Sequence, residues 1–146
     1  MDDAFLDDFR RTITDAAERL LLCSDADASR PLAPGKWSKK EVIGHLIDSA
    51  ANNHARFVRA QLQDDLVFDD YDQARWVEVQ RYRERPWADL VRLWHAYNLH
   101  IASVMESADA AVVARPPLDY LMPDYVAHLK HHLRQIFPTT ASFGRH

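Results

Sequence analysis

Four segments of this chain carry apolar side chains three and four residues apart, which is the spacing of a helix that buries one face. They run over residues 2–22, 38–63 and 86–108, and from Pro123 to a stop at Pro138. No segment shows the alternation of apolar and polar residues that is typical of a strand. The sequence therefore predicts an all-α fold. We expect an antiparallel four-helix bundle with a longer insertion between its second and third helices.

Local signals mark the ends of these segments. Ser38 is followed three residues later by Glu41, the spacing of a capping box at the start of the second helix. The prolines and glycine within residues 30–37 predict a loop before it. Within the insertion, residues 72–83 predict one more short helix, and residues 139–146 predict a tail after the last helix.

The composition narrows the class of protein. The chain has 146 residues, which fits one domain over residues 1–146, and its 47% hydrophobic content is typical of a folded globular protein. A single cysteine excludes an intramolecular disulfide framework and a cysteine-rich zinc site. The net charge of −4 argues against a nucleic-acid partner. No apolar run is long enough to span a membrane, and the acidic N-terminus lacks the core of a signal peptide, so we expect a cytoplasmic protein.

Three of the eight histidines carry the strongest chemical signal. His128 and His132 are four residues apart, so both imidazoles face the same side of the fourth helix and can bind one metal ion. His45, near the start of the second helix, is the natural third ligand. It lies well off the centre of the apolar face of that helix, so an exposed position fits the spacing equally well. The neighbouring Gly44 indicates either a close helix crossing at this site or packing elsewhere.

Three more residues are candidates for the pocket or for contacts behind the metal ligands. Asp48 lies one turn from His45 and is alternatively a solvated helix residue. Asn98, on the inner side of the third helix, either lines the pocket or is a satisfied core amide. Trp76, in the insertion, either belongs to a lid over the pocket or packs the insertion onto the bundle. The remaining histidines are expected on the surface or in packing roles: His54, His95, His100, His131 and His146.

Two longer motifs combine these residues. The stretch Trp37–Asp48 reads WSKKEVIGHLID, and the stretch Asp124–Ile136 reads DYVAHLKHHLRQI. Together, and at this separation, they resemble the DinB/YfiT-like superfamily of bacterial proteins over essentially the whole domain. The resemblance implies a four-helix bundle of DinB type. It also implies a divalent metal ion bound by His45, His128 and His132.

The resemblance further implies a class of chemistry. Three neutral imidazoles leave coordination positions open for water or substrate, as in a catalytic site. Zinc and nickel both suit imidazole ligands. Superfamily members with this layout include transferases that use low-molecular-weight thiols, a thiol-dependent isomerase and hydrolases, and several form homodimers. We therefore expect a metal-dependent thiol S-transferase or hydrolase that acts on a small molecule.

Two other functions fit the same sequence. One is a non-catalytic helical-bundle module that binds a small ligand or a partner helix, for example in a stress response. This alternative stays open because the sequence places no obvious general base beside the histidines. The other is a purely structural bundle with an apolar dimer face. Metal binding and turnover separate both from an enzyme.

Overall fold

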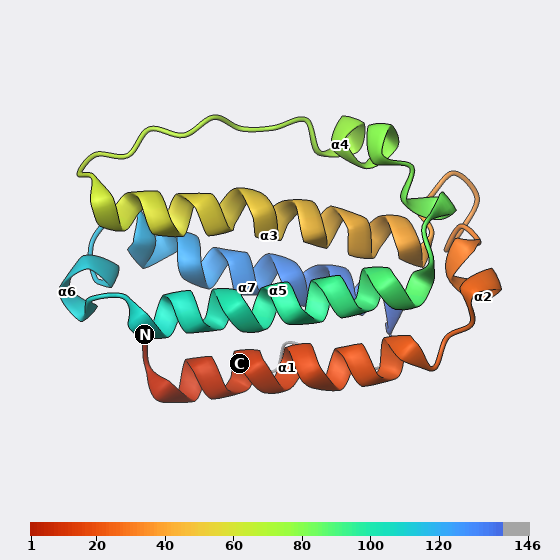
Figure 1. Ribbon diagram of the computed structural model, residues 1–146, viewed down its shortest axis with the longest axis horizontal. Helices are drawn as coiled ribbons and strands as arrows, with labels where there is room; N and C mark the ends of the chain where they lie inside the picture. The colour runs from red at the N-terminus through yellow and green to blue at the C-terminus, as the bar shows by residue number, and fades with distance from the viewer. Residues whose placement is uncertain (139–146) are drawn as a thin grey trace.

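The computed structural model describes residues 1–138, so the expected tail over residues 139–146 lies outside the described part (Figure 1). The prediction of an all-α bundle is confirmed. The elements are α1 (Asp3–Leu21), α2 (Asp25–Ser29), α3 (Lys39–Leu62), α4 (Gln73–Gln80), the 3₁₀ turn η1 (Tyr82–Glu84), α5 (Trp87–Ser107), α6 (Ala110–Val113) and α7 (Leu118–Ile136).

Four long helices, α1, α3, α5 and α7, form the bundle (Figure 1). α1 and α7 run in one direction, and α3 and α5 run in the other. α5 therefore packs antiparallel to α1, and α7 packs antiparallel to α3. α3 and α5 pack side by side in the same direction, because the insertion between them returns along the outside of α3 before α5 begins.

α3 is buried on two faces. Its apolar face, which includes Ile43 and Leu46, packs into the core. A second, polar face carries His45, Asp48 and Ser49, and each of these residues is at most 4% exposed. Polar groups without partners are costly away from water, so this face needs partners from other elements.

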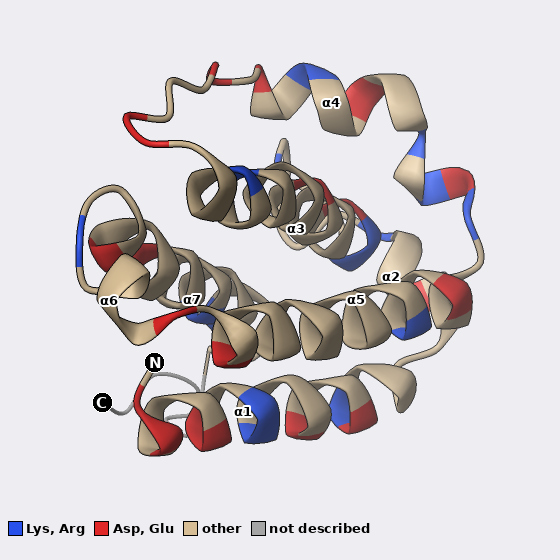
Figure 2. Ribbon diagram, turned by 60° about the vertical axis from the view of Figure 1, so that its left-hand side comes forward, with Lys and Arg blue, Asp and Glu red and all other residues tan. Residues whose placement is uncertain are grey.

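The segment that leads from α3 to α4 supplies part of that cover. Residues 64–72 contain five aspartates and no lysine or arginine, and the acidic positions are visible in Figure 2. Arg56 of α3 donates to the carbonyl of Asp69 at 2.9 Å, and its guanidinium lies 4.3 Å from the centre of the Phe68 ring. One arginine thus binds this acidic segment to α3.

The start of α7 differs from the prediction. The helix begins at Leu118, five residues before Pro123, where the sequence predicts it to open. Leu118 and Met122 are fully buried, and they extend the apolar stripe of the helix towards its N-terminus. Burying two such side chains stabilises the fold by about 3–6 kcal/mol, against a cost of about 3 kcal/mol for a proline inside a helix. The packing therefore outweighs the proline.

The other predicted boundaries are confirmed. The capping box at Ser38 is present, and the helix expected over residues 72–83 is α4 followed by η1. The short helices α2 and α6 were not predicted, because five and four residues are too few to show a helical period. None of the described helices combines the length and apolar character that a membrane span requires.

Gly44 allows an aromatic ring of η1 to lie directly on the backbone of α3. A Cβ atom at this position would lie 2.1 Å from Cδ2 of Tyr82. The Tyr82 ring is itself buried, with 6% of the residue exposed. The neighbour that explains the glycine is therefore the insertion rather than a crossing of two long helices.

We predict that Gly44→Ala destabilises the protein by about 1–3 kcal/mol, because the added methyl group overlaps the Tyr82 ring. Urea unfolding measures the change. In a Tyr82→Ala background the same substitution should become neutral or stabilising, because alanine then contributes only its better helix propensity, about 1 kcal/mol. An equal loss of stability in both backgrounds would contradict this explanation of the glycine.

Candidate metal centre

Three histidines from two antiparallel helices meet near the end of the bundle where α3 begins. His45 lies on α3, and His128 and His132 lie on successive turns of α7. The Nε2 atom of His128 is 3.3 Å from that of His45 and 3.1 Å from that of His132. Each ring contributes one nitrogen, and the three nitrogens lie within 4.8 Å of one another. Histidine nitrogens at this spacing can bind a single metal ion. The structure thus brings together the three residues that the sequence singles out.

The spacing of these nitrogens fits a metal ion. Nitrogens bound about 2.0–2.1 Å from a tetrahedral zinc lie about 3.3–3.4 Å from one another. The two shortest separations, 3.1 and 3.3 Å, are close to that value. Three ligands also leave the fourth position of a tetrahedron open to water or a substrate.

All three imidazoles favour the neutral form. Burial, followed by the nearby His132 and His128, lowers the pKa of His45 to about 3. Burial and the neighbouring histidines lower the pKa of His128 to about 4, and burial lowers the pKa of His132. Neutral imidazole is the form that donates a lone pair to a metal ion.

Two residues of the quoted motifs, to which the sequence assigns no role of their own, contact these rings. Nδ1 of His132 lies 2.9 Å from Oε1 of Gln135, so its N–H donates to the amide carbonyl and leaves Nε2 with its lone pair. Trp37 packs against His45 with ring centres 5.2 Å apart. Gln135 follows His132 by three residues, a spacing that can reveal such a contact. No spacing rule links Trp37 to His45, because Trp37 precedes the helix.

Asp48 is buried rather than solvated. Its Oδ1 lies 2.6 Å from the hydroxyl of Tyr82 and 2.8 Å from Nε2 of Gln80, and its Oδ2 is buried without a hydrogen-bond partner. The buried Nδ1 of His45, one turn away, has no partner either. Asp48 therefore lies one helical turn from His45 and is hydrogen-bonded to the insertion.

The other two candidates lie in different surroundings. Asn98 is fully buried, donates to the carbonyl of Trp94 at 2.9 Å and accepts from the hydroxyl of Tyr125 at 2.5 Å. These bonds are those of a satisfied core amide. Trp76 is 38% exposed and packs against Tyr71, with ring centres 5.0 Å apart. Both residues of this contact belong to the insertion, so Trp76 packs against a neighbour within the insertion.

The remaining described histidines occupy surface or packing positions. Nδ1 of His54 lies 2.9 Å from the hydroxyl of Tyr97, and Nε2 of His95 lies 3.2 Å from the hydroxyl of Thr14. The residues His100 and His131 are exposed. These observations agree with the roles expected from the sequence.

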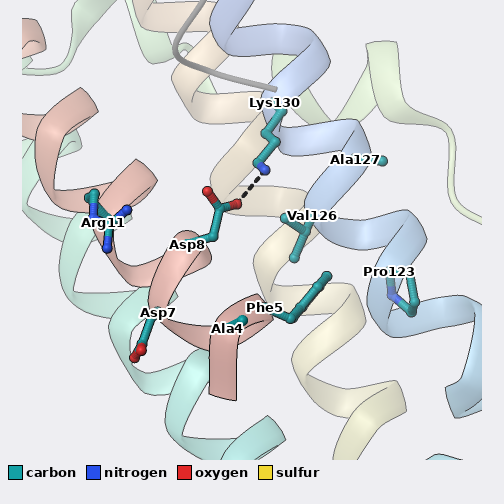
Figure 3. A pocket seen from close by; sticks show the side chains of 9 residues that line it. All are labelled: Ala4, Phe5, Asp7, Asp8, Arg11, Pro123, Val126, Ala127 and Lys130. Atoms are coloured by element: carbon teal, nitrogen blue, oxygen red, sulfur yellow. Dashed lines mark hydrogen bonds and ion pairs between the residues drawn. The ribbon is translucent and has the colours of Figure 1, made fainter. Parts of the chain in front are cut away.

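Two cavities lie against α7, on opposite sides of it. One, of about 500 Å³, adjoins the histidine cluster and is lined by Leu32, Gly35, Lys36, Trp37, Val42, His132 and Gln135. The other, of about 740 Å³, lies between α1 and α7, where Asp8 and Lys130 form an ion pair at 2.5 Å (Figure 3). Lys130 is two residues from both His128 and His132, so it projects from the opposite face of the helix. The larger cavity is thus separate from the cluster.

Two proteins of known sequence are similar to this chain. A protein of Geobacillus thermodenitrificans (strain NG80-2), named "Putative metal-dependent hydrolase", is 24% identical over 123 residues, which cover 77% of this chain and 69% of that protein. A protein of Bacillus pumilus (strain SAFR-032) with the same name is 28% identical over 126 residues, which cover 77% of this chain and 70% of that protein.

A solved structure and a family model complete the comparison. YfiT from Bacillus subtilis, described as "a probable metal-dependent hydrolase with an unusual four-helix bundle topology", matches with a TM-score of 0.79 and 18% identity. The match covers 94% of this chain and 87% of YfiT, and at this identity it shows a shared fold. The model of the DinB superfamily matches residues 8–136. The resemblance seen in the sequence is confirmed, and this chain belongs to the DinB superfamily.

Proposed function

We propose that this protein is a metal-dependent hydrolase of a small molecule, with a divalent ion held by His45, His128 and His132. The convergence of three neutral imidazole nitrogens at 3.1 and 3.3 Å is the observation that carries this proposal. The two relatives named as metal-dependent hydrolases support the same reaction class.

Each residue of the cluster has a distinct task in this proposal. The three Nε2 atoms are the ligands, and zinc or nickel is the ion that such ligands suit. When bound, the ion would acidify a water molecule and polarise the bond to be cleaved. Gln135 keeps the proton of His132 on Nδ1, and Trp37 packs against one side of His45. These contacts hold the ligand nitrogens in place.

The cavity beside His132 is our candidate for the substrate pocket. Its volume of about 500 Å³ lies within the range of small-molecule sites, about 300–1,000 Å³. Trp37 and Leu32 offer apolar surface, whereas Lys36 and Gln135 offer polar groups. A low-molecular-weight thiol as co-substrate is the alternative within the same site, since such an ion also stabilises a thiolate.

We predict that the protein purified without a tag binds about one divalent ion per chain. His45→Ala and His132→Ala should lose it, because two imidazoles form a much weaker site than three. Elemental analysis and titration with zinc measure the content. The matched control is His100→Ala, an exposed histidine of α5 outside the cluster, which should retain the ion. A wild-type protein that neither carries nor takes up a divalent ion would contradict the proposal.

We predict that metal binding at pH 6 releases fewer than one proton from the three histidines, because their lowered pKa values leave them already neutral. Three ordinary histidines with a pKa of 6.5 would release about two. Calorimetry in buffers of different ionisation enthalpy counts the protons. Release of two or more would show that burial does not keep these imidazoles neutral.

We predict that the metal-loaded protein hydrolyses a member of a panel of small esters, amides and phosphoesters, and that His128→Ala abolishes this turnover. A chromogenic screen at equal metal loading measures the rate. Turnover that requires an added low-molecular-weight thiol would identify the transferase instead. A metal-loaded protein without either activity would favour the non-catalytic binding module.

A further inference from the structure

Asp48, Tyr82 and Gln80 form a closed ring of polar atoms beside the histidine cluster. Oδ1 of Asp48 lies 2.6 Å from the Tyr82 hydroxyl and 2.8 Å from Nε2 of Gln80. The Tyr82 hydroxyl also lies 2.8 Å from Oε1 of Gln80, which closes the ring. Tyr82 is 6% exposed and Asp48 is 3% exposed, so the contact between these two side chains is shielded from water.

With Asp48 ionised, the ring has one proton too few to form a hydrogen bond at each of its three contacts. Nε2 of Gln80 also donates to the carbonyl of Trp76 at 3.0 Å, which fixes the amide with its Oε1 towards Tyr82. The single hydroxyl proton of Tyr82 then faces two acceptors, Oε1 of Gln80 and Oδ1 of Asp48. With Asp48 ionised, one of these contacts joins two acceptors without a proton between them.

A proton on Asp48 satisfies every contact. The acid O–H of Asp48 then donates to Tyr82, the hydroxyl of Tyr82 donates to Gln80, and the amide of Gln80 donates back to Asp48. Two other observations favour the neutral acid: burial raises the pKa of Asp48 although Tyr82 and Gln80 oppose it, and Oδ2 is buried without a partner. An unpaired buried oxygen costs less on a neutral acid than on a carboxylate. Burial, and next the charge of an ionised Asp48, would raise the pKa of Tyr71 in the segment before α4, so this tyrosine stays neutral and adds no charge to the ring.

The ring is attached to the turn of α3 that carries His45. Asp48 lies one turn after His45, and the Tyr82 ring rests on Gly44, the residue before it. Residues before and after His45 in the chain, Gly44 and Asp48, thus contact the insertion. Trp37 packs against its ring from outside α3.

We infer that Asp48 is protonated within the buried ring that it forms with Tyr82 and Gln80, and that this ring is a positioning device that fixes His45 for metal binding. The second part rests on the proposed function, because it takes His45 to be a ligand. Residues that support metal ligands in this way change metal affinity about 10- to 100-fold when they are removed.

The protonation is tested by ¹³C NMR titration of the aspartate carboxyl carbons in the full chain without metal. Asp48 should titrate at a pH clearly above the ordinary aspartate pKa of about 4. The variant Gln80→Leu gives the sharper result. If Gln80 acts only as a donor to the carboxylate, its removal raises the pKa of Asp48. If it closes the ring, its removal lets Tyr82 donate to the ionised form, and the pKa falls. An unchanged or raised pKa would overturn the protonated ring.

The positioning role is tested by zinc affinity at a pH where the titration shows Asp48 protonated. Tyr82→Phe keeps the ring that packs on Gly44 and removes only the hydroxyl, so affinity should fall about tenfold or more. The matched control is Tyr97→Phe, which removes a hydroxyl bonded to His54 and should leave affinity unchanged. Thermal unfolding of both variants corrects for stability, and the visible spectrum of bound cobalt reports the geometry of the site.

The outcomes separate the two proposals. Equal zinc affinity of Tyr82→Phe and the wild type would overturn the positioning role while leaving the metal site intact. If the wild type binds no metal, the proposed function fails and the positioning role fails with it. The titration still decides whether Asp48 is protonated.

Discussion

Burial of the polar face of α3 is the constraint on which the rest of this structure depends. His45 and Asp48 are both almost completely buried, and neither belongs to the apolar core. Polar groups can be kept from water only where other elements supply partners. α7 supplies His128 and His132 on one side, and the insertion supplies Tyr82 and its neighbours on the other. The candidate site is thus the place where α3 satisfies its second face.

The same burial sets the electrostatics of the cluster. Charged imidazoles in this position would repel one another and would lose their hydration, so the neutral forms are favoured. Lone pairs of neutral nitrogens turned towards one another repel unless a proton or a cation lies between them, and each neutral ring carries one N–H. A divalent cation satisfies all three at once, and this is the physical reason to favour a metal centre over a simple packing cluster.

The sequence predicts the fold well, because long helices with one buried face leave a clear period. It also predicts the pair on α7, because His128 and His132 follow that period. The sequence does not decide whether His45 is buried or exposed. Periodicity detects apolar helix faces, and it cannot recognise a polar face that other elements cover. The contact between Gly44 and Tyr82 joins elements far apart in the chain, and no local pattern contains it. The early start of α7 escaped prediction for a related reason, because tertiary packing of Leu118 and Met122 outweighs the local effect of Pro123.

The length of the insertion follows from the direction of the helices. α3 and α5 run in the same direction, so the chain must return along the length of α3, about 36 Å for its 24 residues. Ten residues over 63–72 cover about that distance only when extended, whereas a helix of the same length would cover about 15 Å. The returning segment lies against α3 through Arg56 and leads through α4 to the turn that carries Tyr82. A short hairpin between antiparallel helices would leave Asp48 without these partners. The parallel arrangement of α3 and α5 and the buried polar site beside them are therefore two consequences of one connection.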